Sequence, residues 1–318
     1  MEAPQETILL TGATGVVGLA VAARLAAEGY RLKVLARKPA LARGLLPAGT
    51  EMVAGSLQDV VALEEALQGC TACVHMAGLV SFANKDRDAL LETNHRGTQT
   101  VVNACLAQPG LGHLVHIGSV AAIPQALADV RTVPRPGQFS SYYGYTKRLS
   151  ELEVERGAAE GLGTTILRPS VVLGKHPAGR SSSAVLRIAE RPTTACPPGQ
   201  LHWVAVQDVA EAVAQALLKG PGGQTYVLDA EPTTWRTLFA AYRRQRGIEG
   251  RVYQLSKGMV AIAGRLSGMV GSLLDLPVPS KRQLLAMLEE KHYGGRAEAT
   301  ALLGRPFTSL EATVAGLV

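Results

Sequence analysis

The sequence has little of several features that mark other classes of protein. Charged residues make up 18% and aromatic residues 4% of the chain, and lysine and arginine form no long basic run of the kind that nucleic-acid tails carry. The four cysteines, at positions 70, 73, 105 and 196, indicate no disulfide framework, and no spacing of histidine, cysteine or carboxylate fits a metal site. We therefore expect no nucleic-acid partner, no metal ion and a reducing compartment.

No stretch predicts a membrane span, which needs roughly 20 uninterrupted apolar residues. The best candidate, residues 255–276, is interrupted by Lys257 and Arg265. Residues 1–6 are polar and acidic and do not resemble a signal peptide. These absences favour a cytoplasmic protein without a membrane segment.

The composition provides enough apolar material for a large core. The chain has 318 residues, of which 47% are hydrophobic, and a formal net charge of +6. This length suits one large α/β unit with an appended subdomain. The mild basicity suits an anionic cofactor.

A glycine-rich turn near the start is the strongest local signal. Residues 7–10 predict a strand, and apolar residues at helical spacing follow from Val17. Between them, Gly12 permits a sharp turn, Gly15 permits close approach of a phosphate, and Gly18 permits tight packing of the helix on the sheet. The unpaired N–H groups at the start of that helix favour a pyrophosphate, so the stretch predicts a dinucleotide site.

The next predicted strand, residues 31–36, ends in a basic pair. In NAD-selective folds an acidic residue about 20 positions beyond the first glycine binds the ribose 2′-hydroxyl. This chain has Arg37 and Lys38 there, with no acid between them and Glu51. Because a guanidinium and an ammonium suit a 2′-phosphate, we expect NADP, with NAD as the alternative cofactor.

Strands and helices alternate along the first two thirds of the chain. This alternation predicts an α/β fold of the Rossmann type, a doubly wound parallel sheet with right-handed crossovers. After the basic pair, strands are predicted over residues 51–54, 72–76, 113–117, 164–167 and 226–228, and helices over 60–68, 85–108 and 141–159.

A tyrosine, a lysine and a serine form the candidate catalytic group. Tyr143 and Lys147 lie four residues apart on the helix predicted over 141–159, so their side chains share one face. A phenol titrates near 10, and a nearby ammonium lowers that pKa. Ser119 follows the strand predicted over 113–117, at the edge where open α/β sheets bind ligands. It would hold a substrate carbonyl oxygen beside the Tyr143 proton.

Taken together, these motifs resemble the extended short-chain dehydrogenase/reductase family, and the likeness spans nearly the whole chain. Within the family, Arg37 and the YYGYTK stretch most resemble the branch of dihydroflavonol reductases and 3β-hydroxysteroid dehydrogenases. The matching stretches are residues 11–18, 74–78, 94–98, 118–121, 143–147 with Glu151, 168–174, 203–210 and 297–317.

The resemblance implies a Rossmann domain with a smaller, mainly helical C-terminal subdomain that binds substrate. The NAD(P)-binding domain would comprise residues 1–174 and 201–229, and the subdomain residues 175–200 and 230–318. It also implies a homodimer that pairs through two long helices.

The resemblance implies that Tyr143 acts as acid or base, that Lys147 binds the cofactor ribose and tunes Tyr143, and that Ser119 orients the substrate. With the basic pair included, the expected cofactor-binding residues are Gly12, Thr14, Gly15, Val16, Val17, Arg37, Lys38, Ser56, Leu57, Ala77, Gly78, Tyr143, Lys147, Pro169, Val171 and Val172.

Two positions depart from the family pattern. The family often has aspartate where this chain has Ser56, and serine where it has Gly118. Asn94 matches a family position near the active site, and a purely structural role for it is equally plausible. We assign no role to His176 or His202.

The leading functional hypothesis is an NADP-dependent oxidoreductase that transfers hydride between nicotinamide and a small, uncharged organic carbonyl or alcohol. The segments expected to line the substrate, residues 80–82, 123–140, 175–198 and 254–276, are apolar or small. The alternative is a nucleotide-sugar epimerase or dehydratase that retains NAD. A third hypothesis is a dinucleotide-binding sensor or scaffold without turnover.

Overall fold

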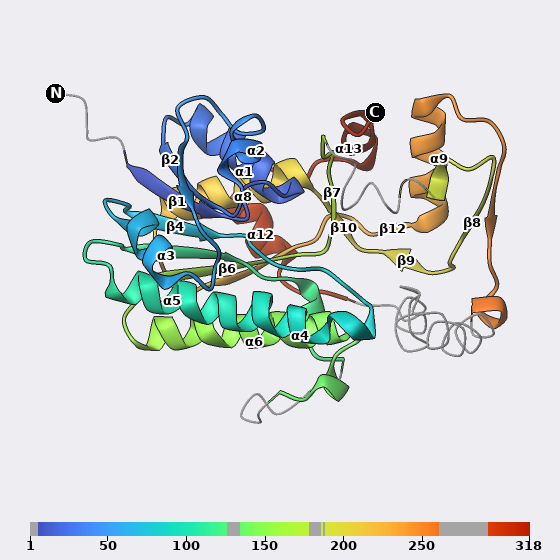
Figure 1. Cartoon of the computed structure of the whole chain (residues 1–318). Helices are drawn as coiled ribbons and strands as arrows, with labels where there is room; N and C mark the ends of the chain where they lie inside the picture. Colours follow the sequence, from blue (N-terminus) through green and yellow to red (C-terminus); the bar gives the residue numbers. More distant parts are fainter. Residues whose placement is uncertain (1–5, 126–133, 178–185, 187, 261–291) are drawn as a thin grey trace.

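A parallel sheet forms the centre of the protein in the computed structural model, which describes residues 6–125, 134–177, 186, 188–260 and 292–318 (Figure 1). Every neighbouring pair of strands in this seven-stranded sheet is parallel, which confirms the expected Rossmann fold. The strands follow the order β11 (Thr225–Leu228), β6 (Thr164–Pro169), β5 (His113–Ile117), β4 (Ala72–His75), β1 (Thr7–Thr11), β2 (Arg31–Ala36) and β3 (Glu51–Ala54).

The chain reverses its direction of travel across the sheet between β1 and β4. From β1 it moves outward through β2 to β3, and from β4 it moves the other way through β5 and β6 to β11. Ligands of open α/β sheets bind at such a reversal, outside the carboxyl ends of the strands. The residues that follow Thr11 and His75 therefore frame the expected site.

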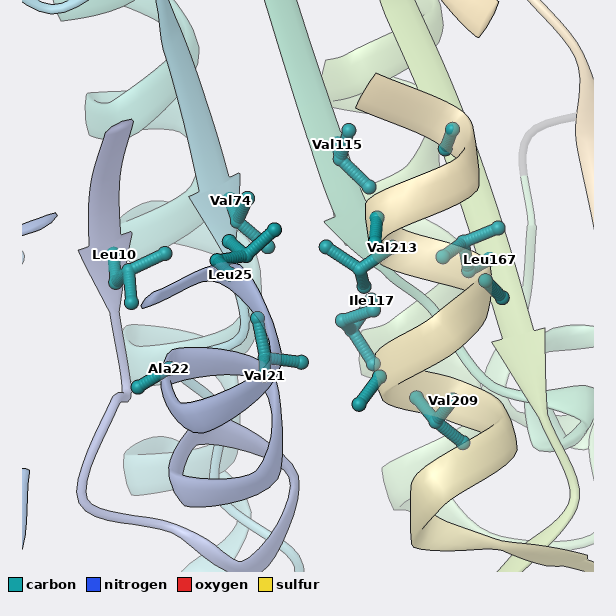
Figure 2. Close-up of a cluster of buried hydrophobic side chains, with 14 of the residues drawn as sticks. Leu10, Val21, Ala22, Leu25, Val74, Val115, Ile117, Leu167, Val209 and Val213 are labelled. Carbon is teal, nitrogen blue, oxygen red and sulfur yellow. The ribbon is translucent and has the colours of Figure 1, made fainter. Parts of the chain in front are cut away.

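Helices cover both faces of the sheet (Figure 1). One layer contains α1 (Val16–Ala27), α8 (Val206–Lys219) and α12 (Arg296–Leu303), and the other contains α3 (Val60–Leu67), α5 (Gly97–Ala107) and α6 (Tyr142–Ala159). A short helix, α2 (Pro39–Arg43), packs on β3. Because both faces are covered, the central strands are continuous apolar runs rather than alternating ones. Figure 2 shows side chains of α1 and α8 packed against Leu10, Val74, Val115, Ile117 and Leu167 of the sheet.

The long helix predicted over residues 85–108 is not continuous. It is composed of a 3-10 turn, η1 (Asn84–Asp86), a short α4 (Arg87–Leu90), a π-helical segment, η2 (Leu91–Arg96), and α5. The π segment contains Asn94, which is buried and hydrogen-bonded to residues outside this helix. π segments are rare and occur mostly at functional sites, so this departure draws attention to Asn94.

Beyond β6 the chain forms a smaller set of elements with its own apolar core, which includes Trp203, Phe239 and Tyr242. Here short strands accompany the expected helices. β7 (Val171–Leu173) pairs with β10 (Trp203–Ala205), β8 (Thr193–Cys196) with β13 (Arg251–Gln254), and β9 (Gln200–Leu201) with β12 (Thr233–Thr234), beside α9 (Trp235–Arg246) and α13 (Leu310–Ala315).

The domain boundaries expected from the sequence stay a prediction. Contacts cross these boundaries: α12, which lies in the residues expected for the smaller subdomain, packs on α8 and β11 of the sheet unit. The predicted segments 123–140, 175–198 and 254–276 lie partly outside the described residues.

All four cysteines are buried free thiols. No helix within the described ranges is long and apolar enough to cross a membrane. The same part of the chain contains no group of histidine, cysteine and carboxylate side chains that could hold a metal ion.

The turn between β1 and α1 leaves no room for side chains at two of its glycines. Gly12 has a φ of +71°, and a Cβ there would lie 2.5 Å from the Ala77 nitrogen at the end of β4. A Cβ on Gly18 would lie 2.3 Å from the Gly12 carbonyl oxygen. The close contact of Gly18 is therefore with the turn itself and not, as the sequence suggested, with the sheet.

We predict that Gly18→Ala lowers the free energy of unfolding by about 1–3 kcal/mol, because the added methyl group overpacks rigid backbone. Gly44→Ala is the matched control, since a Cβ at Gly44 meets nothing within 4 Å, and we expect a change under about 0.5 kcal/mol. Urea unfolding of both variants measures the difference. Equal stabilities would show that the turn relaxes around the methyl group.

Candidate active site

The first turn of α1 has open N–H groups. Its N-cap residue, Gly15, makes no side-chain capping bond, whereas α3, α6 and α9 each begin with a capping side chain. Thr14 and Gly15 are exposed. The start of α1 can therefore accept an anion through its backbone N–H groups and its positive dipole end.

The ends of β1 and β4 are joined beside this turn. The Thr11 hydroxyl accepts a 3.3 Å hydrogen bond from the Ala77 N–H and lies 2.7 Å from His75 Nδ1. Gly78, which follows, is exposed. The fold thus brings Gly12, Ala77 and Gly78, three of the expected cofactor contacts, to the same edge of the sheet.

The basic pair lies at the end of β2, next to the end of β3. The side chains of Arg37 and Lys38 are exposed and make no ion pair or side-chain hydrogen bond with any other described residue. Ser56 is half-buried in the turn after β3. Leu57 is buried, and its side chain would contact a Cβ placed on Gly97, so only its main chain is left for a cofactor contact.

Tyr143 and Ser119 meet at the carboxyl end of β5. Ser119 is buried, and its hydroxyl lies close enough to the Tyr143 phenol to lower the pKa of that phenol. The same hydroxyl accepts a bond of 3.1 Å from the Ala121 N–H, which holds it in place. The ring of Phe82 lies edge-on to Tyr143 at 6.1 Å between centroids. These contacts bring together a candidate proton donor, a polar anchor and an aromatic wall.

Lys147 lies behind this pair and is directed at the main chain. Its Nζ donates a 2.7 Å hydrogen bond to the carbonyl oxygen of Ile117, the last residue of β5. Burial lowers the pKa of Lys147 to about 8, against the opposing effect of the Glu151 carboxylate. Lys147 therefore changes charge close to neutral pH.

The expected lowering of the Tyr143 pKa by Lys147 is not found. Burial raises the pKa of the phenol above its usual value, Glu151 adds to the rise, and the Ser119 hydrogen bond opposes it. The physical reason is that the Lys147 ammonium is hydrogen-bonded to Ile117 instead of to the phenol. Tyr143 is thus neutral at physiological pH and suited to donate a proton.

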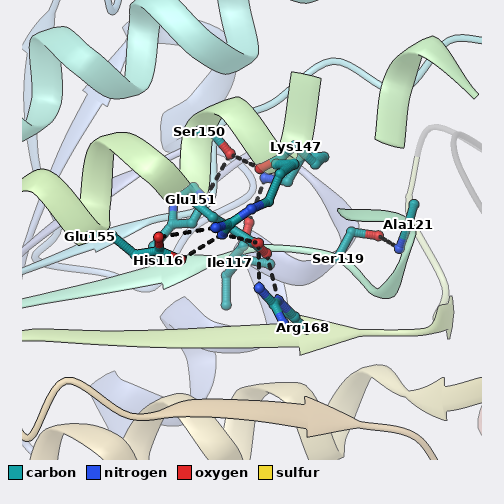
Figure 3. Close-up of polar contacts among 10 residues, drawn as sticks. His116, Ile117, Ser119, Ala121, Lys147, Ser150, Glu151, Glu155 and Arg168 are labelled. Carbon is teal, nitrogen blue, oxygen red and sulfur yellow. Dashed lines mark hydrogen bonds and ion pairs between the residues drawn. The ribbon is translucent and has the colours of Figure 1, made fainter. Parts of the chain in front are cut away.

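A buried ion pair between Glu151 and Arg168 lies near Lys147 and Ile117 (Figure 3). Glu151 is fully buried, and Arg168 of β6 donates to its two oxygens at 3.0 Å and 2.7 Å. A Cβ on residue 118 would lie 2.4 Å from Glu151 Oε1. This contact explains why the chain has Gly118 where serine is usual in the family that it resembles.

Asn94 ties the loop after β4 to α6. Its side-chain oxygen accepts from the Leu79 N–H at 2.7 Å, and its amide nitrogen donates to the Leu79 carbonyl and to the Thr146 hydroxyl, each at 3.0 Å. All three bonds connect Asn94 to the loop after β4 or to α6. Asn94 therefore fixes the position of the helix that carries Tyr143 and Lys147.

The last expected contacts follow the end of β6. Pro169 is buried, Val172 is half-buried, and Val171 is 39% exposed at the start of β7. An exposed apolar side chain beside the catalytic candidates is suited to face a ligand.

Residues 8–229 match the sequence pattern of the NAD dependent epimerase/dehydratase family. The chain belongs to this family. It is thus an extended short-chain dehydrogenase/reductase, and reductases are prominent among its relatives. "Sterol demethylase protein B" of Methylococcus capsulatus is 29% identical over 72% of this chain and 71% of its own. A 4-hydroxy-2-methyl-3-oxo-4-farnesyl-3,4-dihydroquinoline-1-oxide ketoreductase of Stigmatella aurantiaca is 26% identical over 76% and 74%.

Solved structures show the same fold. The crystal structure of gox2253 has a TM-score of 0.81 and 26% identity and covers 98% of this chain and 96% of that one. A UDP-glucuronic acid 4-epimerase of Bacillus cereus, solved with UDP-glucuronic acid and NAD, has a TM-score of 0.72 and 18% identity over 97% and 96% of the two chains. Family and fold together make this protein an NAD(P)-dependent oxidoreductase.

Several histidines near the family's cofactor edge were not assigned from the sequence. His75 bonds Thr11 and Thr98 through its two ring nitrogens, and it stacks on His116 at 5.2 Å. Burial lowers the pKa of both rings, so both are neutral. His176 Nε2 lies 2.9 Å from the Thr14 carbonyl oxygen and so connects the segment after β7 to the glycine turn. Their positions in or after predicted strands were the only sequence signal.

The Lys147 pKa predicts how activity depends on pH. The ammonium is present below a pH of about 8 and is lost above it. We expect kcat/KM to fall about tenfold per pH unit above that point, because the neutral amine no longer offers a charged hydrogen-bond donor to the ribose of a bound cofactor. Steady-state rates across pH measure this profile.

The variant Glu151→Gln removes the carboxylate that supports the ammonium, so the alkaline midpoint should move to lower pH. A midpoint that stays near the ordinary lysine value in the wild type would contradict the assignment.

Proposed function

We propose that the protein is an NADP-dependent carbonyl reductase or alcohol dehydrogenase that acts on a small, uncharged organic substrate. The observation that carries this proposal is that the Ser119 hydroxyl and the Tyr143 phenol lie close together at the carboxyl end of β5, with Lys147 buried behind them. This is the arrangement that carbonyl reduction needs: a polar anchor for the carbonyl oxygen and a neutral phenol beside it.

Each residue has a distinct task in this proposal. The Ser119 hydroxyl orients the substrate oxygen, and Tyr143 donates its proton to that oxygen in reduction or accepts it in oxidation. The Lys147 ammonium hydrogen-bonds the cofactor ribose. A bound nicotinamide supplies or accepts the hydride.

The cofactor fits the residues present. The backbone at Gly12 and Gly15 has no Cβ that would obstruct a pyrophosphate, and the N–H groups of α1 are uncapped. Arg37 and Lys38 are exposed and uncommitted at the end of β2, where a 2′-phosphate would lie. This pair supports NADP over NAD.

Apolar surface around Tyr143 supports an uncharged substrate. Val80 is 64% exposed and Phe82, whose ring contacts Tyr143, is 54% exposed. An exposed apolar rim next to a few polar groups is typical of a site for an organic molecule. Names of relatives such as ketoreductase point the same way.

The two remaining hypotheses stay distinct. Structural neighbours that bind UDP-sugars and NAD favour an epimerase or dehydratase that retains NAD, for which Arg37 would be irrelevant. A sensor without turnover would not need Tyr143 and Lys147.

We also propose a cytoplasmic location and a homodimer through the helices of residues 85–108 and 141–159.

We predict that Tyr143→Phe lowers kcat at least about a hundredfold, because the variant has no proton to donate. NADPH affinity should stay close to wild type, measured by cofactor fluorescence. Tyr145→Phe is the matched control, since the same change two residues away leaves the Ser119 contact intact. A Tyr143→Phe enzyme that keeps its rate would remove the basis of the proposal.

We predict that Arg37→Asp reverses the cofactor preference. Loss of a charge-assisted hydrogen bond to the 2′-phosphate should weaken NADPH binding by about 10- to 100-fold, while NADH binding is retained or improved. Arg236→Asp, the same charge change on exposed α9, controls for net charge. Tightly bound NAD in the purified protein and an unaltered Arg37→Asp variant would favour the epimerase reading instead.

A further inference from the structure

A second buried polar group lies outside the Tyr143 site and consists of His202, Asp229 and Tyr293. His202 lies between β9 and β10, Asp229 follows β11, and Tyr293 precedes α12. The side chains of Asp229 and His202 are only 3% and 12% exposed. Three segments that are distant in the sequence therefore bury titratable side chains against one another.

His202 and Asp229 make one short hydrogen bond with each other, and each has one further polar atom without a partner among the described residues. His202 Nδ1 lies 2.7 Å from Asp229 Oδ2. His202 Nε2 and Asp229 Oδ1 are buried and have no hydrogen-bond partner among the described residues. The Tyr293 ring lies edge-on to the imidazole at 4.7 Å, and burial, with the Asp229 charge, raises the pKa of its phenol to about 12.

Backbone pairing places this group beside the cofactor edge of the site. The Val171 N–H donates to the His202 carbonyl oxygen at 3.2 Å, and the Ser170 N–H donates to the Leu228 carbonyl oxygen at 3.0 Å. His202 and Asp229 thus flank the segment between β6 and β7, where we expect cofactor contacts. A ligand that lies against Val171 is within reach of the pair.

The two atoms without a partner, His202 Nε2 and Asp229 Oδ1, can bind a hydrogen-bond donor. Because the carboxylate can only accept, Nδ1 carries a proton, and in the neutral imidazole Nε2 is then an acceptor like Asp229 Oδ1. A buried acceptor without a partner costs about 1–3 kcal/mol. His75 avoids this cost by using both of its ring nitrogens.

The negative charge of Asp229 determines which kind of hydrogen-bond donor can bind here. Among the described residues no lysine or arginine pairs with Asp229, and the nearby Arg296 is paired with Glu231. A buried negative charge repels phosphate and carboxylate groups. A neutral hydroxyl donates to either acceptor without this penalty.

We propose that His202 and Asp229 form a subsite that binds a hydroxyl group of the substrate, at some distance from the carbonyl held by Ser119 and Tyr143. The inference rests on the proposed reductase function and narrows its substrate to hydroxylated ketones or the corresponding diols. Tyr293 closes one side of the subsite with its ring.

A series of methyl ketones that end in a hydroxyl tests the subsite. Each is paired with the ketone in which a methyl group replaces that hydroxyl, and the chain length is varied to scan the distance between the two sites. At the length that fits, we expect kcat/KM with NADPH to favour the hydroxylated member about tenfold, the value of one buried hydrogen bond.

The double variant His202→Phe with Asp229→Leu should abolish that preference. It removes both partners and so leaves no unpaired buried charge, and the phenyl ring keeps the contact with Tyr293. Turnover of the methyl members, measured in the same variant, is the baseline against which the preference is calculated. Equal preference in wild type and variant at every chain length would overturn the subsite while leaving the reductase function standing.

Binding is measured independently of turnover. With NADP⁺ present, the assigned Nε2 signal of His202 in ¹⁵N NMR should shift on addition of the hydroxylated ketone and not of its methyl partner. Absence of any shift across the series overturns the subsite even if no ketone is reduced. Failure of every ketone to be reduced, with the shift present, would count against the reductase function alone.

Discussion

The close approach of β1 and β4 at position 12 is the constraint on which the rest of the site depends. Gly12 has a backbone conformation that other residues rarely adopt, and a Cβ there would collide with the Ala77 main chain. Because nothing occupies that space, the ends of the two central strands meet at the point where the chain reverses across the sheet. The open start of α1 and the end of β4 then lie at the same edge of the sheet.

The buried charged residues near the site position one another and contribute little to the stability of the fold. A buried ion pair such as Glu151 with Arg168 gains little net free energy, because both groups lose hydration. It does place a carboxylate beneath the end of β5 and so keeps the Lys147 ammonium charged despite its burial. The neutral rings of His75 and His116 add no competing charge nearby. The active-site edge thus has one tunable cation and one neutral phenol.

Most of the central sheet could be predicted from the sequence. Its central strands β1, β4 and β5 are almost entirely buried and contain short apolar runs, whose ends are marked by turn residues. The interruption of the helix over residues 85–108 could not be predicted, because its apolar periodicity does not reveal the π segment. That segment is stabilised by bonds from Asn94 to Leu79 and Thr146, which the sequence does not place near it. The paired strands β8 and β13 were missed for the same reason, because each is short and depends on a distant partner.

The sequence by itself determined the kinds of element, the glycine turn, and which side chains follow the strand ends; these depend on local sterics and on periodicity. Only the tertiary structure decided that Lys147 bonds to Ile117, that Gly118 makes room for Glu151, and that His202 meets Asp229. Those outcomes depend on distance and burial between segments far apart in the chain. Hydrogen bonding and pKa are set by such surroundings, which exist only once the segments are packed.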